Sequence, residues 1–250
     1  MKFHGRILLA VMLGAGTVFF AGLRGEVAVQ NDPMALPSLS PVFTAAGAAG
    51  NATAEYQGAI SAENNAGFFA RVAGQEVRRL LINSGGGGVA AAIELADWVH
   101  AQQLDITVTG VCLSSCANYV FPAANRKEIV PGAIVAWHGN YHHLAHTGLW
   151  RDDVALRMQR DGEDEQTATR YVQAQVARLV ALERGFFARI GIDEQVCWIG
   201  KQPPYNVPDY FFLSVDDMAR FGITEVQAPA GYPATDLASF DANIVFLELE

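Results

Sequence analysis

The sequence has little positive charge and few charged residues of either sign. It contains 17 Lys and Arg side chains against 26 Asp and Glu, for a formal net charge of −9. Binding to a nucleic-acid backbone requires clustered Lys and Arg side chains, so the composition argues against a nucleic-acid partner. Only 17% of the residues are charged and 51% are hydrophobic, which is typical of a globular domain with one core.

Cysteine is scarce, with three residues in 250. In an exported chain, three cysteines allow one disulfide and leave one thiol. Cys112 and Cys116 are four positions apart. If both lie near the start of one helix, their separation of about 6 Å is within disulfide reach. The sequence leaves this pairing open.

The N-terminal segment has the pattern of an export signal. Lys2 and Arg6 precede an uncharged run over residues 7–23. These 17 residues exceed a signal-peptide core of about 7 to 15 and fall short of the roughly 20 of a spanning helix. No A-x-A cleavage pattern follows. We predict a signal peptide or an uncleaved membrane anchor over 1–23, with a packed helix as the alternative.

Export would place the body of the protein in a bacterial periplasm, or anchor it in the inner membrane facing the periplasm. Residues 24–51 contain Pro33, Pro37 and Pro41 among many Ser, Ala and Gly residues. This composition predicts a flexible linker without fixed structure. Residues 229–250 are predicted to form a C-terminal tail, which leaves 52–228 as a single folded domain.

Strand and helix patterns alternate through that domain. Alternation of this kind predicts an α/β fold with a mainly parallel sheet, whose ligands gather beyond the strand ends. We predict strands over 53–60, 77–83, 106–110 and 134–137. Helices are predicted over 61–73, 89–99, 114–121 and 167–190, and a last strand–helix unit over 211–226.

A run of four glycines, Gly85 to Gly88, lies between a predicted strand and a predicted helix. The sequence around it completes neither the G-x-x-x-x-G-K-[ST] pattern nor the dinucleotide-binding pattern. Glycine lets backbone amides turn toward a bound oxygen without a β-carbon in the way. The run therefore predicts an oxyanion hole, which needs only amides, and a purely structural turn is the alternative.

Two further residues follow predicted strands directly. Ser114 begins a helix, where neighbouring amides can stabilise the charge on an attacked carbonyl, although serine is also a common helix cap. His138 ends the apolar strand Ile134–Trp137. An imidazole can take and return a proton at neutral pH, and a histidine satisfied within the core is the alternative. Parallel strands would bring both side chains to one edge of the sheet.

The segments I-N-S-G-G-G-G-V, G-V-C-L-S-S-C-A and V-A-W-H resemble the Clp protease proteolytic subunit (ClpP) family of the ClpP/crotonase superfamily. That family has an S-P-G-G turn, a G-x-A-x-S-M nucleophile turn and an M-I-H segment in the same order. Ser114 and His138 are 24 residues apart, similar to the family spacing. Phe211–Ile223 resembles the family's F-L-S-A-x-E-A-x-x-Y-G-L-I ending. The resemblance covers residues 53–226, and its exported branch fits the N-terminal signal.

The resemblance implies that Ser114 is a nucleophile and His138 its general base. It also implies an oxyanion hole formed by the amides of Gly86, Gly87 and Ser115. The fold it implies is built from repeated β-β-α and β-α-β units. Cysteines flank the nucleophile in some exported relatives.

The chain departs from the family at three positions. Gly85 replaces the proline of the first turn, and Ser115 replaces the methionine after the nucleophile. The position of the family's catalytic aspartate falls on Tyr210. A one-residue shift would restore Asp209, our predicted third catalytic residue, although an extended strand would turn its side chain to the opposite face. A Ser–His dyad and a degenerate enzyme are the alternatives.

These features predict an exported serine peptidase-like hydrolase that needs no cofactor and acts on a peptide or protein substrate. The alternative on the same fold is a weak or inactive oligomeric binding module. The resemblance implies a homo-oligomer formed through helix 167–190, and membrane contact through the N-terminal segment if it is uncleaved. No ATPase partner can be inferred for an exported domain.

Two other activities are compatible with parts of the sequence. A crotonase-type acyl-CoA enzyme would use the paired amides without the Ser–His pair. The sequence also contains a histidine cluster that could bind zinc, but its pattern is not H-E-x-x-H, so no metal is predicted. The cluster consists of His138, His142, His143 and His146.

Overall fold

The computed structural model describes residues 42–46, 52–232, 236–237, 240 and 243–250. The predicted signal or anchor, residues 1–23, and the first part of the predicted linker lie outside these ranges. Within them, no helix is both long and apolar enough to cross a membrane.

The main sheet has seven strands, in the order β1-β2-β3-β4-β5-β8, with β6 also pairing with β4. β1 and β2 are antiparallel, and every other neighbouring pair is parallel. The predicted α/β class and mainly parallel sheet are therefore confirmed. The strands are β1 (Val42–Ala46), β2 (Ala52–Gln57), β3 (Val77–Ser84), β4 (Asp105–Leu113), β5 (Lys127–Ile129), β6 (Ile134–Ala136) and β8 (Val226–Gln227).

The sequence explains where these strands run. Side chains of β2 alternate between buried and half-buried positions, the period of a strand with two different faces. All three residues of β6 are buried, as expected for a strand covered on both faces. β4 continues to Leu113, three residues beyond the predicted end, and this extension brings the strand directly to Ser114.

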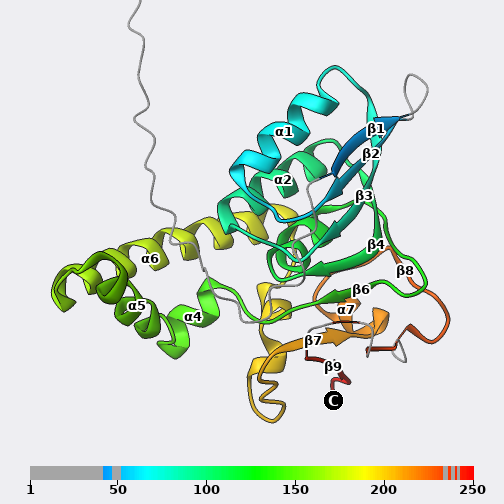
Figure 1. Cartoon of the computed structure of the whole chain (residues 1–250). Coiled ribbons are helices and arrows are strands. Elements are labelled where there is room, and N and C mark those ends of the chain that lie inside the picture. Colours follow the sequence, from blue (N-terminus) through cyan, green and yellow to red (C-terminus); the bar gives the residue numbers. More distant parts are fainter. Residues whose placement is uncertain (1–41, 47–51, 233–235, 238–239, 241–242) are drawn as a thin grey trace, which may run out of the picture.

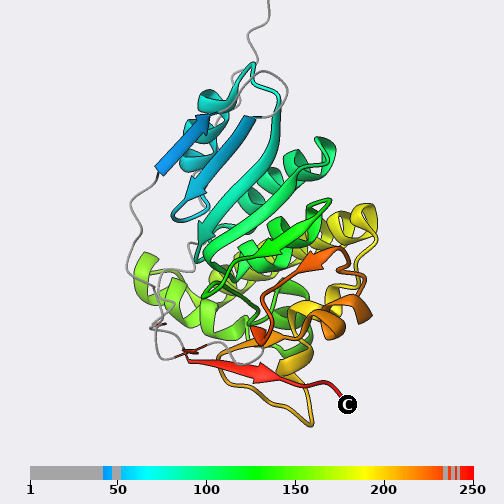
Figure 2. The same cartoon turned by 90° about the vertical axis from the view of Figure 1, so that its right-hand side faces the viewer.

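The helices follow the predicted pattern in the first half of the domain. Helices α1 and α2 pack on one face of the sheet (Figures 1 and 2). The Ser61 side chain caps α1 by accepting a hydrogen bond from the Asn64 amide. The α-helices are α1 (Ala62–Val72), α2 (Val89–Ala101), α3 (Phe121–Ala123), α4 (Tyr141–Thr147), α5 (Arg151–Asp161), α6 (Glu165–Ile190) and α7 (Val215–Arg220). Three shorter helical turns are the π-helix η1 (Cys116–Val120) and the 3₁₀ turns η2 (Glu194–Cys197) and η3 (Ile199–Lys201).

Helices α4 and α5 and the first half of α6 form a helical arm that extends away from the sheet (Figure 1). The arm has its own small apolar cluster, separate from the main core. The second half of α6 belongs to the main core through Phe186 and Phe187. The predicted helix over 167–190 is part of this continuous α6. The buried residues of the arm are Val154, Ala168, Val172 and Val176.

A second, two-stranded parallel sheet pairs β7 (Tyr210–Leu213) with β9 (Ile244–Leu247). Figure 2 shows it at the lower edge of the molecule. β9 lies in the segment predicted to be a tail, and β1 lies in the predicted linker, which was expected to have no fixed structure. Phe246 packs against Phe212, with ring centroids 5.2 Å apart. Phe43 packs in the same way against Tyr56 at 5.0 Å. These aromatic contacts explain why both segments join the fold.

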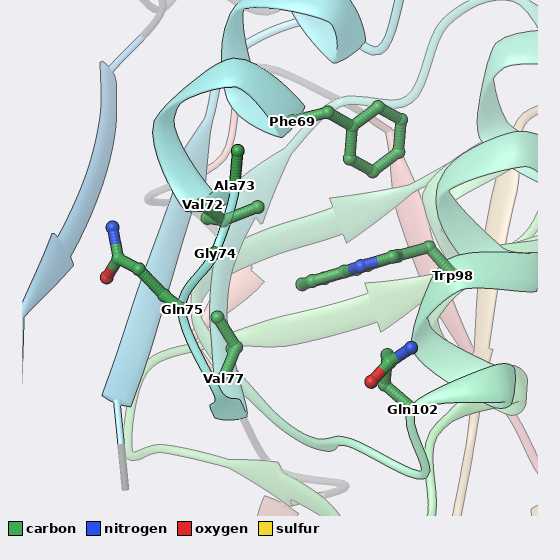
Figure 3. Close-up of a pocket in the computed structure, with 8 residues that line it drawn as sticks. All are labelled: Phe69, Val72, Ala73, Gly74, Gln75, Val77, Trp98 and Gln102. Carbon is green, nitrogen blue, oxygen red and sulfur yellow. The ribbon is translucent and has the colours of Figure 1, made fainter. Parts of the chain in front are cut away.

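A pocket of about 380 Å³ opens between the ends of α1 and α2 and the start of β3 (Figure 3). Phe69 and Trp98 line it, with ring centroids 5.9 Å apart. It lies beside Val77, at the opposite end of β3 from Ser84. Since a strand rises by about 3.3 Å per residue, β3 separates the pocket from the glycine turn by roughly 23 Å. The pocket is therefore not part of the site predicted from the sequence.

Candidate active site

Ser114 lies in a strained turn between β4 and the π-helix η1. Its φ is +54°, a left-handed conformation that costs a non-glycine residue about 1 kcal/mol or more. The Ser114 amide donates to the Ala136 carbonyl at 3.2 Å, which fixes the turn against the end of β6. Strained backbone and π-helical turns are both frequent at functional sites, and here they are adjacent.

His138 meets Ser114 at this edge of the sheet. Its Nε2 atom lies 2.7 Å from Ser114 Oγ, within hydrogen-bonding distance. Both side chains are half-buried, so neither is sealed inside the core. β4 and β6 are parallel neighbours that pair Leu113 with Ala136, and both strands end just before these two residues. The structure thus brings together the hydroxyl and the imidazole that the sequence predicted at one edge.

A disulfide joins Cys112 to Cys116 and encloses the Ser114 turn. The two Cα atoms are 5.2 Å apart, and both side chains are fully buried. Cys112 lies on β4 rather than at a helix start, so the ring joins the strand to η1. Cys197 is buried with a free thiol, and burial raises the pKa of that thiol.

The glycine run packs directly against the Ser114 turn. Gly86 has a φ of +96°, and a Cβ atom added there would lie 2.7 Å from the Leu113 carbonyl oxygen and 2.8 Å from Ser114 Cβ. At Gly87 the same atom would collide with the carbonyl group of Ile60. Only glycine fits these two positions, because neighbouring backbone occupies the space of a side chain on both sides of the turn.

The three predicted oxyanion donors differ in the structure. The Gly86 amide donates to Ser84 Oγ at 3.1 Å, so this N–H is used inside the turn, and a role as an oxyanion donor stays a prediction. The Gly87 and Ser115 amides donate to no acceptor in the described part of the chain. Gly86 instead brings the turn close to Ser115, whose amide nitrogen would lie 2.9 Å from a Cβ at Gly86.

Tyr210 lies against the imidazole of His138. The two rings are stacked, with centroids 4.5 Å apart and planes 26° apart. The Asp209 carboxylate accepts from Asn243 Nδ2 at 3.0 Å, and the Asp209 carbonyl accepts from Lys201 Nζ. Tyr210, rather than Asp209, therefore covers the ring face, and an orienting role for Asp209 stays a prediction. Burial lowers the pKa of Lys201.

Asn118, which was not predicted from the sequence, links the two halves of the site. Its amide donates to the Ser114 carbonyl at 2.8 Å. Its Nδ2 donates to the Gly139 carbonyl at 2.9 Å, directly after His138. The residue before the imidazole is fixed as well, since Trp137 exchanges two backbone hydrogen bonds with Phe211. No motif marks Asn118, although its position one turn after Ser114 is a signal that could have identified it.

The histidine cluster does not converge in the structure. His142 Nδ1 lies 2.7 Å from Glu194 Oε1, while His143 stacks on Trp198 with planes 16° apart. Burial, and then the nearby charges of Lys201 and His146, lower the pKa of His143. In the described ranges, no three His, Cys, Asp or Glu side chains are grouped to hold a metal ion.

No protein family and no curated protein matches the sequence. Solved structures with a similar fold include ClpP1 from Listeria monocytogenes, which is 17% identical over 74% of this chain and 94% of that chain, with a TM-score of 0.39. An enoyl-CoA hydratase/isomerase from Marinobacter aquaeolei is 11% identical over 75% of this chain and 70% of its own, with a TM-score of 0.39. A variant of the 1510-N membrane-bound stomatin-specific protease is 10% identical over 82% of this chain and 100% of its own, with a TM-score of 0.36. These values describe a distant likeness of fold.

Proposed function

We propose that this protein is an exported serine hydrolase that cleaves peptide bonds with a Ser114–His138 pair. The observation that carries the proposal is the 2.7 Å contact between Ser114 Oγ and His138 Nε2. A nucleophile and a base within hydrogen-bonding reach at an accessible edge are the signature of nucleophilic catalysis. Asp209 is assigned no step, because its carboxylate is bonded to Asn243.

In the proposed reaction, His138 takes the proton of Ser114 as the hydroxyl oxygen attacks the peptide carbonyl. The imidazolium then donates this proton to the leaving amine, and an acyl-enzyme remains on Ser114. Water, activated by the same imidazole, hydrolyses the ester. The amides of Gly87 and Ser115 would stabilise the oxyanion, and each such donor contributes about 10²- to 10³-fold in rate.

The contact between the hydroxyl and the imidazole favours hydrolysis over acyl-CoA chemistry of the crotonase type, which requires only the paired amides. The sequence resemblance supports a peptide as the substrate. The buried Cys112–Cys116 disulfide supports export, since structural disulfides persist mainly in oxidising compartments. A homo-oligomer stays a prediction from the resemblance.

The proposal is tested by treating the purified protein with a fluorophosphonate probe, which labels activated serines. We expect labelling of the wild type, none for Ser114→Ala, and a rate about 10²- to 10⁴-fold lower for His138→Ala. His100→Ala, at an exposed position in the last turn of α2, serves as the control and should label normally. Mass spectrometry of a peptide mixture then identifies cleaved bonds.

A folded wild type that the probe does not label would overturn the hydrolase proposal and favour the binding module. Labelling without any peptide cleavage would leave the serine hydrolase chemistry in place and overturn the peptide substrate.

A further inference from the structure

Glu183, on α6, is a wholly buried carboxylate that the proposed reaction does not use. Its relative exposure is 0%, and among the described residues no ion pair includes it. Taking a carboxylate out of water is costly unless hydrogen bonds compensate. The contacts of Glu183 therefore show what this residue contributes to the fold.

All three hydrogen bonds to Glu183 come from elements beside the site. The Tyr141 amide donates to Oε1 at 3.0 Å and the His142 amide to Oε2 at 2.9 Å. These amides belong to the first two residues of α4, and backbone N–H groups in the first turn of a helix need acceptors from outside its hydrogen-bond ladder. Tyr119, on the π-helix η1, donates its hydroxyl to Oε1. One carboxylate thus joins the start of α4 to the helix that follows Ser114.

The two joined elements follow the candidate nucleophile and base closely in the chain. η1 begins two residues after Ser114, and α4 begins three residues after His138. Asn118 fastens the intervening loop at Gly139. Glu183 fastens the far end of the same loop, so the backbone after His138 is held at two points.

We propose that Glu183 is a positioning residue: its carboxylate fixes α4 to η1 and thereby holds the His138 imidazole at Ser114. This inference deepens the proposed hydrolase function and rests on it. Glu183 does not touch the reacting atoms, so it acts only through the loop and Tyr119.

The charge of Glu183 gives this role a pH dependence. Burial raises the pKa of Glu183, and the three hydrogen bonds only partly oppose this. Once protonated, the group carries a hydroxyl that donates and has less capacity to accept the two α4 amides and Tyr119. The titratable and charged groups around it are Tyr119 from η1, His142 from α4, Glu194 and Cys197 from η2, and Arg184 from α6.

Protonation of Glu183 should affect stability and activity in opposite directions. Because the pKa of Glu183 is higher in the folded state, its contribution to stability is complete below its ordinary pKa and is lost as the pH rises through the raised value. The positioning contacts need the carboxylate, so they weaken as the pH falls through that same value. Acid should therefore slow the enzyme, whereas protonation of Glu183 by itself should not unfold the protein.

The test compares Glu183→Gln with wild type by fluorophosphonate labelling across pH and by amide hydrogen exchange over residues 139–147. The variant keeps Oε1 and replaces the other acceptor with an amide donor, so it imitates the protonated group. At a pH where Glu183 is ionised, we expect labelling of the variant to be about 10- to 10²-fold slower than that of the wild type, the effect of a misplacement near 1 Å. We also expect a less steep loss of rate in acid and faster exchange at Tyr141 and His142.

Two further variants divide the role of Glu183. Tyr119→Phe removes only the contact with η1, so labelling should slow while exchange at α4 stays as in wild type. Glu194→Gln is the matched control: it removes the negative charge beside the His142 side chain but leaves the α4 amides bonded to Glu183, and its labelling at the same pH should be unchanged.

The inference is overturned if Glu183→Gln labels at the wild-type rate and loses rate in acid as steeply as the wild type. It is also overturned if labelling of the variant slows only in proportion to a loss of folded protein. If the wild type itself is not labelled, the hydrolase proposal fails separately. Exchange at Tyr141 and His142 then still decides whether Glu183 anchors α4, and unchanged exchange overturns the anchoring.

Discussion

The two halves of the candidate site are held by different kinds of interaction. The Ser114 turn is closed by a covalent ring, Cys112–Cys116, and pressed against the backbone of Gly86. The His138 loop has polar and aromatic contacts instead, from Asn118 and Tyr210 and, through α4, from Glu183. The Ser114 half is therefore fixed by steric contacts that do not titrate, whereas the position of His138 depends on side chains that can be exchanged one at a time.

The largest expected effect tests the Ser114 half of the site, which steric contacts hold in place. In Gly86→Ala, the new Cβ meets the Leu113 carbonyl and Ser114 Cβ. We expect probe labelling to fall by about 10²-fold or more, because the adjacent amides proposed as oxyanion donors are displaced. The free energy of unfolding should fall by about 1 to 3 kcal/mol, as measured by urea denaturation.

The control for this variant is Gly74→Ala. Gly74 also has a positive φ, +74°, but no described atom lies within 4 Å of an added Cβ. It should lose about 1 kcal/mol of stability and label normally. Equal labelling of the two variants would show that the glycine turn does not constrain the nucleophile.

The second effect concerns the covalent ring. Replacing both Cys112 and Cys116 with Ala should lower the free energy of unfolding by about 2 kcal/mol, the chain-entropy value for a ring this short. Urea unfolding with and without a reductant measures it. Reductant should shift the midpoint of the wild type but not of the double variant, and both proteins retain Cys197. A wild type insensitive to reductant would show that the ring is not a constraint in solution.

The smallest effect concerns the His138 half of the site. Tyr210→Ala removes the ring stacked on His138, and an aromatic pair is worth about 0.5 to 1.5 kcal/mol. Labelling per folded molecule should slow by roughly 2- to 12-fold. Tyr210→Phe retains the stack and should stay within about twofold of wild type. If Phe slows the enzyme as much as Ala does, the hydroxyl rather than the ring supports His138.

The difference between the Ser114 half and the His138 half also explains how much of the site could be predicted from the sequence. Ser114, the glycine run and the cysteines lie within short segments bounded by clear strands, so the local pattern together with the family resemblance indicated them. Asn118 and Glu183 act through contacts with residues 21 and 42 positions away, and no local spacing indicates such pairs. For Asp209, the prediction is limited by the register of the strand. Successive strand residues face opposite ways, so a one-residue register decides whether it or Tyr210 meets the imidazole.

The fold shows a similar limit. The strands and helices between residues 52 and 101 run almost as predicted, because each is a long periodic segment. β1, β9 and the helices α4 and α5 were missed. β9 is four residues long and pairs with β7 across more than 30 intervening positions, so it is stabilised only by tertiary contacts. The arm helices are largely polar and present only a short apolar stripe.

The left-handed backbone at Ser114 has an evolutionary consequence. Glycine adopts this conformation with the least strain, so a Gly in that place would suit the turn better than the hydroxyl-bearing residue does. Selection for thermodynamic robustness alone would favour losing the hydroxyl. A lineage that keeps serine there retains a residue that the local backbone disfavours.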